Sequence, residues 1–287
     1  MSERVTSAPL LEAKNIVVEF PMKGFRKPPF RVLHGVSLDI LPGETVGLVG
    51  ESGSGKTTIG RAILGLIEPA AGTITFDGQD ITKLHRRERR KLSDSIQVVF
   101  QDPYTSLNPT MTVGDILSEP LLVKAELKGS ARNRIRELLD QVGLPTGAVG
   151  KFPREFSGGQ RQRVAIARAL ALSPRLIVCD EPVSALDLST QARVLDLFIE
   201  IQERTGVAYL FVSHDLSVVR HISHRVAVMY KGNIVEYGDG DQVTSDPVHP
   251  YTQKLLMSAP VANPVRQRER RLERQMMLAV AGTKGQN

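Results

Sequence analysis

At 287 residues, 41% of them hydrophobic, the chain is long enough to form one large α/β domain or two modest ones around a packed core. Lysine and arginine outnumber aspartate and glutamate by 37 to 31, but the basic residues are spread along the chain apart from the runs HRRERRKL and RQRERRLER, which we interpret as solvated helix faces. The single cysteine, Cys179, excludes an internal disulfide and a metal cluster built from cysteines, and its place in the apolar run LIVCDEP favours a packing role.

The first twenty residues contain Ser, Glu, Arg and Lys and no apolar core of a secretory signal, so we expect no such signal. No run of about 18 uncharged apolar residues occurs in the sequence. If the protein works at a membrane, we therefore expect another chain to supply the spanning segments.

Eight stretches are predicted to form strands, because apolar and polar residues alternate in them or because they are short apolar runs rich in β-branched residues. They are 10–20, 31–40, 45–50, 72–78, 95–102, 175–182, 207–215 and 225–238. Apolar residues at helical spacing predict helices at 57–67 and 190–205. Strands that alternate with helices of this length predict βαβ units and a mainly parallel sheet.

From Met111 onwards the pattern changes to helices, with apolar residues three and four positions apart in 115–127 and 131–144. We interpret this region as an inserted helical subdomain. Its boundaries are indicated by Pro109 and by the stretch LPTGAVGKFPREF.

The stretch GESGSGKTT, residues 50–58, matches the pattern G-x-x-x-x-G-K-[ST] and lies between a predicted strand and a predicted helix. In such a phosphate loop, glycines allow backbone N–H groups to turn towards phosphate oxygens, and the helix that follows adds the positive end of its dipole. We expect Lys56 to neutralise charge on the β- and γ-phosphates and the Thr57 hydroxyl to bind Mg²⁺.

The apolar run LIVC ends in Asp180 and Glu181, which predicts a buried strand with carboxylates at its carboxyl end, where ligands bind in open α/β sheets. We expect Asp180 to hold Mg²⁺, directly or through water. Glu181 is the candidate that orients or deprotonates an attacking water.

A second glycine-rich stretch, EFSGGQRQRVAIARAL, carries no lysine after its glycines. Ser157, Gly158 and Gly159 are predicted to open a helix, with Ser157 as the N-cap, so that free backbone N–H groups and a partial positive charge point outwards from its first turn. Such a helix start is suited to bind a phosphate.

With the phosphate loop, FSGGQ and DEPVSALD in this order, the chain resembles the nucleotide-binding subunits of ABC transporters from about Leu10 to Pro260. The resemblance implies a P-loop NTPase fold of class α/β, with a RecA-like core, an antiparallel β subdomain and an inserted α-helical subdomain. It implies a nucleotide-binding domain at 10–262, with the helical insertion at about 111–156, a C-terminal segment at about 233–262 and a basic, partly frayed tail at 263–287.

The resemblance also implies site residues, with ATP and Mg²⁺ as ligands. The catalytic residues are Glu181, His214 as the switch histidine and Gln101 as the Q-loop glutamine, and Mg²⁺ is assigned to Thr57, Gln101 and Asp180. The nucleotide is assigned to the phosphate loop of one subunit and to the SGGQ segment (157–160) and Asp187 of its head-to-tail partner. The full set of nucleotide-binding residues is Gly50, Glu51, Ser52, Gly53, Ser54, Gly55, Lys56, Thr57, Thr58, Phe20, Ser157, Gly158, Gly159, Gln160 and Asp187.

One site assignment stays open. Alignment of the first strand places Phe20 against the adenine, but the loop that follows is unusually long, so that Phe30 competes for this role.

The stretches VFQDPYTSLNPTMTVGDIL, CDEPVSALDLSTQA and DPVHPYTQKLLMSAP are similar to those of the ATPase subunits of oligopeptide and dipeptide permeases, and the long loop 21–30 resembles the second subunit type. The resemblance implies an ATPase at the cytoplasmic face of the inner membrane. Its expected partners are a second, related ATPase chain, two transmembrane permease subunits and an extracytoplasmic solute-binding protein, with no nucleic acid.

Two further functions remain possible at this point. One is a soluble ABC ATPase that acts on nucleic acid or ribosomes, and the other is a module of a multi-enzyme complex that does not transport. The intact pair of Glu181 and His214 argues against a module that does not hydrolyse ATP. Peptides are the first candidate for the transported solute, and nickel, glutathione, opines and other small solutes are the alternatives.

Overall fold

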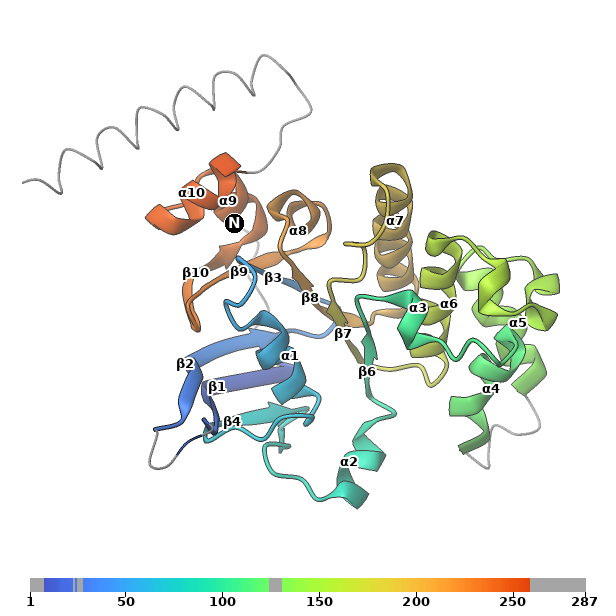
Figure 1. Ribbon diagram of the computed structural model, residues 1–287, viewed down its shortest axis with the longest axis horizontal. Helices are drawn as coiled ribbons and strands as arrows, with labels where there is room; N and C mark the ends of the chain where they lie inside the picture. Colours follow the sequence, from blue (N-terminus) through green and yellow to red (C-terminus); the bar gives the residue numbers. More distant parts are fainter. Residues whose placement is uncertain (1–7, 23, 25–27, 124–130, 259–287) are drawn as a thin grey trace, which may run out of the picture.

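The computed structural model (Figure 1) describes residues 8–22, 24, 28–123 and 131–258. The predicted tail at 263–287 lies outside the described residues, as do parts of the loop 21–30 and of the helix predicted at 115–127.

A six-stranded sheet in the order β10-β9-β3-β8-β7-β6 forms the centre of the fold. All neighbours in it pair in parallel except β9 and β10, which form an antiparallel hairpin. Strands β3 and β8 are buried along their whole length, as expected for apolar runs covered on both faces. The prediction of a mainly parallel sheet is confirmed. The strands are β3 (Thr45–Val49), β6 (Ile96–Val99), β7 (Leu176–Asp180), β8 (Ala208–Ser213), β9 (Arg225–Tyr230) and β10 (Asn233–Asp239).

A second sheet of four antiparallel strands, in the order β2-β1-β4-β5, forms the antiparallel β subdomain. Its strands are β1 (Leu11–Phe20), β2 (Phe30–Ile40), β4 (Ala71–Phe76) and β5 (Gln79–Asp80). Helix α1 (Lys56–Ile63) packs against both sheets, because Ile59 and Ile63 share one hydrophobic core with Leu33 of β2 and Val178 of β7. The start of α1 is thereby fixed between the two sheets.

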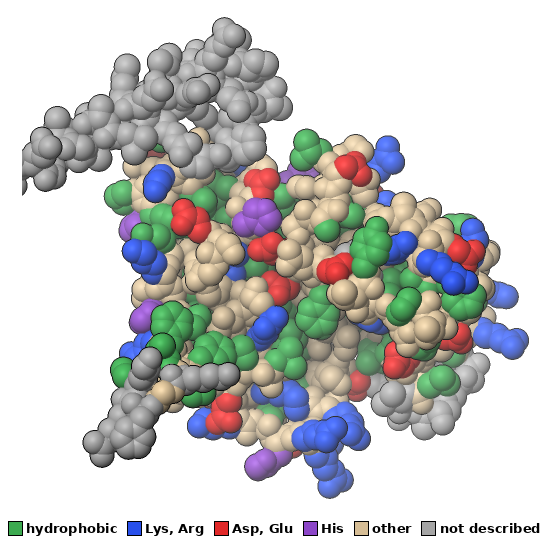
Figure 2. Space-filling model, viewed as in Figure 1, with side chains coloured by type: hydrophobic (Ala, Val, Ile, Leu, Met, Phe, Trp, Pro, Cys, Tyr) green, Lys and Arg blue, Asp and Glu red, His purple; other side chains and the backbone are tan. Residues whose placement is uncertain are grey.

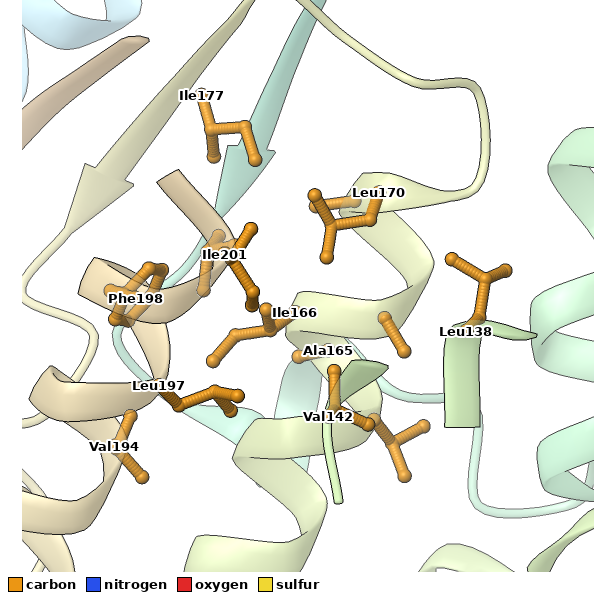
Figure 3. Packing of buried hydrophobic residues seen from close by; sticks show 14 of the residues in the cluster. Leu138, Val142, Ala165, Ile166, Leu170, Ile177, Val194, Leu197, Phe198 and Ile201 are labelled. Atoms are coloured by element: carbon orange, nitrogen blue, oxygen red, sulfur yellow. The ribbon is translucent and has the colours of Figure 1, made fainter. Parts of the chain in front are cut away.

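The predicted helical insertion is built from short helices beside the central sheet (Figure 1). Helix α6 connects it to the core, because Ile166 and Leu170 pack among Phe198 of α7 and Ile177 of β7 (Figure 3). The elements on this side are α3 (Pro103–Ser106), α4 (Val113–Val123), α5 (Ala131–Gln141), the 3-10 helices η2 (Thr146–Gly150) and η3 (Pro153–Glu155), α6 (Gly158–Leu170) and α7 (Leu188–Thr205).

Three helices of the C-terminal third cover this side of the central sheet. Helix α8 (Leu216–Ile222) packs on β3 and β8, α9 (Gly240–Ser245) packs on β9 and β10, and α9 also contacts both α8 and α10 (Pro250–Ser258). They form a small core that includes Val49, Leu216 and Tyr251. Val49 directly precedes the phosphate loop, so this core joins the C-terminal helices to it.

The run HRRERRKL forms helix α2 (Arg86–Leu92), and Figure 2 shows Lys and Arg side chains gathered over it. No residue of α2 is buried, which fits a solvated helix face. The Arg89 side chain is partly buried, and its guanidinium donates a hydrogen bond to the carbonyl of Ile81 at 2.7 Å. None of the helices within the described residues combines the length and apolar character needed to cross a bilayer.

Candidate functional site

The phosphate loop, residues 50–58, connects the carboxyl end of β3 to α1, as predicted from the sequence. Gly50 has no room for a side chain, because an added Cβ would lie 2.1 Å from the carbonyl oxygen of Met229. Gly55 takes a φ of 106° and is the N-cap of α1. At these two positions the loop depends on glycine for close packing and for left-handed backbone geometry.

Lys56 is buried, with 4% of its surface exposed. Its Nζ donates hydrogen bonds to the carbonyl oxygens of Gly50 at 2.8 Å and Glu51 at 3.0 Å. Burial lowers the pKa of Lys56, and the nearby charges of Glu181 and Asp180 act in the opposite direction. The loop thus holds an ammonium group that its own carbonyls and two carboxylates stabilise.

Asp180 lies at the carboxyl end of β7, and the Thr57 hydroxyl donates a hydrogen bond to its Oδ1 at 3.0 Å. Burial raises the pKa of Asp180, while this hydrogen bond lowers it in part. A hydroxyl and a carboxylate side by side are oxygen donors of the kind that Mg²⁺ prefers, so the residues present fit that ion.

Glu181 follows β7 and has a φ of 49°, a conformation that is strained for a residue with a side chain. Its N–H donates to the carbonyl of Val212 in β8 at 3.0 Å, which holds this geometry in place. Its carboxylate lies 3.0 Å from Nδ1 of His214, which follows β8. The strained backbone therefore directs Glu181 towards the predicted switch histidine.

A cavity of about 660 Å³ lies over the phosphate loop. Phe30 of β2 lines it, whereas Phe20 is not among its lining residues and pairs with Phe30 across the β1–β2 ladder. The structure thus places the second of the two aromatic candidates at the cavity. The lining residues are Phe30, Arg31, Val32, His34, Ser52, Gly53, Gly55, Lys56, Thr57, Thr58, Glu181, Lys231 and Gly232.

Several of these residues were not expected from the sequence, among them Arg31, Lys231 and Gly232. The Lys-Gly pair forms the turn of the β9–β10 hairpin, and Gly232 donates its N–H to the carbonyl of Ser54 in the phosphate loop at 3.0 Å. A Lys-Gly pair between two strand patterns could have indicated a tight turn. Nothing local in the sequence indicates that this turn packs on the phosphate loop.

The SGGQ segment begins α6 as predicted, with Ser157 as the N-cap. The Ser157 hydroxyl accepts the N–H of Gln160 at 3.3 Å, and the Gln160 side-chain oxygen accepts the N–H of Ser157 at 3.0 Å. Both residues are exposed. The two bonds satisfy the N–H groups of Ser157 and Gln160 within the chain, and both side chains face solvent at the start of α6.

Asp187 lies beside the SGGQ segment as the N-cap of α7. Its carboxylate accepts hydrogen bonds from the Ser189 hydroxyl at 2.7 Å and the Thr190 N–H at 3.0 Å, and these bonds hold its pKa well below the usual value. Gly159 packs closely on α7, since an added Cβ would lie 2.3 Å from Cγ2 of Thr190.

Two groups of predicted site residues are therefore separate within one chain. Figure 1 shows α1, after the phosphate loop, beside the antiparallel sheet, and α6 among the helices of the insertion. Neither the SGGQ segment nor Asp187 belongs to the lining of the cavity. Gln101, which follows β6 and is exposed, does not line it either.

Two parts of the sequence match known protein families. Residues 33–184 match the ABC transporter family, and residues 235–285 match the C-terminal region of oligopeptide and dipeptide transporters. The chain is 50% identical over 273 residues to the glutathione import ATP-binding protein GsiA of Escherichia coli (strain K12), which covers 93% of this chain and 44% of that protein. It is 51% identical over 267 residues to the protein of the same name from Pectobacterium atrosepticum, which covers 91% of this chain and 43% of that protein. The chain thus spans less than half the length of these curated relatives.

Solved structures are similar as well. The chain resembles cbiO1 of Clostridium perfringens, part of the ABC transporter complex cbiONQ, with a TM-score of 0.74 and 27% identity over 84% of this chain and 92% of that one. It resembles the bacterial ABC transporter cassette MJ0796, solved as a dimer, with a TM-score of 0.71 and 32% identity over 80% of this chain and 98% of that one. A further structure of MJ0796 is described as a post-hydrolysis state bound to ADP and Pi.

Proposed function

The chain belongs to the ABC transporter family, and from this we propose that it is the ATP-binding and ATP-hydrolysing subunit of an importer for peptides or related small solutes. One observation carries the proposal. Lys56, the Thr57–Asp180 pair and the Glu181–His214 pair follow the carboxyl ends of β3, β7 and β8, which are neighbours in the central sheet. Ligands of open α/β sheets bind at this edge.

The phosphate loop would bind the triphosphate of ATP. Its backbone N–H groups and the start of α1 provide donors and a partial positive charge. Lys56 would exchange its hydrogen bond to the Glu51 carbonyl for bonds to β- and γ-phosphate oxygens, while the Gly50 carbonyl continues to hold the ammonium group. Phe30, at the mouth of the cavity and 61% exposed, would contact the base. Lys231 adds a further positive charge to the cavity wall.

Glu181 would act as the general base. Its carboxylate would accept a proton from the attacking water, and His214 would orient that carboxylate and contact the γ-phosphate. Thr57 and Asp180 would hold Mg²⁺, which would supply charge neutralisation at the phosphates. Gln101 stays a proposed member of this set, to be brought in by movement of the segment after β6.

Two copies or two related chains would complete the site as a head-to-tail pair. The separation of the SGGQ segment and Asp187 from the cavity within one chain supports this arrangement, as does the dimeric form of the similar cassette MJ0796. Ser157, Gly158 and Gly159 would then bind the γ-phosphate of ATP on the partner through the start of α6.

The import function is supported by the match of residues 235–285 to oligopeptide and dipeptide transporters, and by relatives named for glutathione import. The same match favours an importer over an ABC module of a soluble complex. We propose a position at the cytoplasmic face of the cell membrane, with two permease subunits, a related ATPase chain and an external solute-binding protein as partners.

Affinity purification from detergent-solubilised membranes tests this function. The tagged chain is expected to bring down two multi-span membrane proteins, and addition of the cognate solute-binding protein to the complex is expected to raise its ATP hydrolysis. Purification with soluble enzymes and no membrane protein would instead support the non-transport alternative.

A further inference from the structure

The C-terminal helix α10 contacts the phosphate loop through one tyrosine. The hydroxyl of Tyr251 accepts the backbone N–H of Glu51 at 3.0 Å, although the two residues lie 200 positions apart in the sequence. Tyr251 is not among the residues that line the cavity, so the hydrogen bond to Glu51 is its connection to the nucleotide site.

The N–H of Glu51 belongs to the same planar peptide group as the carbonyl of Gly50. That carbonyl accepts the hydrogen bond from Lys56 Nζ at 2.8 Å. The peptide group is therefore held at both ends, by Tyr251 on its N–H side and by Lys56 on its carbonyl side. Rotation of this plane would move the carbonyl that fixes the ammonium group.

The Tyr251 hydroxyl is itself held in place. Its side chain is 8% exposed, and its ring packs against that of Tyr230 with centroids 4.2 Å apart. Before α10, the Glu236 carboxylate of β10 accepts the N–H groups of Val248 at 2.8 Å and His249 at 3.1 Å. The C-terminal segment is thus anchored to the sheet on one side and to the phosphate loop on the other.

We propose that Tyr251 is a positioning residue for ATP binding: its hydroxyl fixes the Gly50–Glu51 peptide group and thereby the place of Lys56. The inference rests on the proposed ATP-binding function. The C-terminal region would thereby support the nucleotide site. Without the Tyr251 hydroxyl, the Glu51 N–H loses its hydrogen-bond partner and the phosphate loop is less well preorganised for ATP.

Tyr251→Phe removes the hydroxyl and keeps the ring. The dissociation constant for ATP, measured by titration of the full chain at a temperature well below its unfolding midpoint, is expected to rise about fivefold, as for the loss of one partly buried hydrogen bond. In steady-state assays KM for ATP is expected to rise by a similar factor, with kcat changed less than about twofold.

Tyr237→Phe is the matched control. Tyr237 lies in the same C-terminal third but away from the phosphate loop, and its hydroxyl also bonds a backbone group, in this case as the donor to the carbonyl of Asp39 at 2.8 Å. Its removal is expected to lower the unfolding midpoint without a change in the ATP dissociation constant. A Tyr251→Phe variant that behaves in this way, less stable but with wild-type affinity, would overturn the proposal.

A second variant removes the donor in place of the acceptor. Glu51→Pro has no backbone N–H, so that Tyr251→Phe is expected to add no further loss of ATP affinity in this background. A fivefold loss that persists in the double variant would show that Tyr251 acts by another route. Where Tyr251→Phe alone is too unstable to measure, Glu51→Pro by itself removes the same hydrogen bond, and wild-type ATP affinity in that variant would overturn the proposal.

Lys56→Ala separates this inference from the proposed function. If the wild-type chain binds ATP and Lys56→Ala strongly weakens that binding, the proposed function is supported whatever Tyr251→Phe does. Unchanged affinity in Tyr251→Phe then overturns only the role of Tyr251. Absence of ATP binding in the wild-type chain would overturn both.

Discussion

The Glu181 carboxylate lies 3.0 Å from Nδ1 of His214, across the ends of the neighbouring strands β7 and β8. The contact depends on the left-handed backbone of Glu181, with φ at 49°. It places the proposed general base, Glu181, within hydrogen-bond distance of an imidazole beside the phosphate loop.

Glu181→Gln is expected to leave ATP binding intact and to lower hydrolysis about a hundredfold or more, because the amide cannot accept a proton from the attacking water. Turnover of ATP and equilibrium binding of ATP are measured on the same preparation. The neighbouring Ser184→Ala, which loses a hydroxyl bond to the Glu181 carbonyl at 3.0 Å but keeps the carboxylate, serves as control. Undiminished turnover in Glu181→Gln would remove Glu181 from its role.

Lys56→Ala is expected to weaken ATP binding by about a hundredfold, the scale of two lost charge-assisted hydrogen bonds. The change is read by titration with ATP. Lys231→Ala, which removes a lysine from the wall of the same cavity but not from the phosphate loop, is expected to have a smaller effect. Wild-type affinity in Lys56→Ala would argue against the phosphate-loop assignment.

The parts of the site that the sequence predicts are contiguous. A local sequence pattern is enough to identify the phosphate loop at 50–58 and the carboxylates Asp180 and Glu181, because a loop and a strand end are built from neighbouring residues. The start of α6 at Ser157 is likewise a local cap signal and is found where predicted.

The parts that the sequence does not predict depend on contacts between distant segments. The pairing of Phe20 with Phe30, and the choice of Phe30 at the cavity, follow from strand register across a long loop. Gly232 and Tyr251 reach the phosphate loop from the C-terminal third, and no local pattern encodes that packing. Propensity and spacing therefore locate the chemical groups but not the residues that hold them in place.

Phe30→Ala is expected to weaken ATP binding by about three- to tenfold, since an aromatic contact with the base would be lost. Phe20→Ala is the matched control, because Phe20 faces Phe30 across the ladder but does not line the cavity. Titration with ATP compares the two variants. A larger loss of ATP affinity in Phe20→Ala than in Phe30→Ala would instead assign the contact with the base to Phe20. The loop that follows β1 would then have to adopt a different conformation when ATP is bound.

Arg225→Ala is expected to lower the free energy of unfolding by about 2 kcal/mol. The Arg225 guanidinium donates to Glu44 at 2.6 Å and to Asp39 at 2.8 Å, and thereby joins β9 to the end of β2 and to the turn before β3. The loss is below that of a fully buried pair because the Arg225 side chain is 21% exposed.

Denaturant unfolding measures this change. Lys14→Ala, which removes a surface pair with Glu12 in which the lysine is 62% exposed, is expected to change the free energy of unfolding by less than about 0.5 kcal/mol. Equal losses in the two variants would show that the network around Arg225 contributes no more than a surface pair.

The two glycines of the SGGQ segment are expected to respond differently to alanine. A Cβ at Gly159 would lie 2.3 Å from Cγ2 of Thr190, so Gly159→Ala must shift either the Thr190 side chain or α6 and is expected to cost about 1–3 kcal/mol of stability. A Cβ at Gly158 would lie 3.5 Å from Leu186, an ordinary contact, so Gly158→Ala is expected to fold normally. Denaturant unfolding of both variants checks this difference.

Because Gly158→Ala keeps the fold and the cavity, it isolates the role of the α6 start in the proposed pair. Its affinity for ATP as a single chain is expected to equal that of the wild type, since the SGGQ segment does not line the cavity of its own chain. Hydrolysis by the pair is expected to fall at least tenfold, because the added methyl group would obstruct the approach of the partner's γ-phosphate to the N–H groups at the start of α6. Wild-type hydrolysis in Gly158→Ala would mean that this helix start does not face a partner's nucleotide.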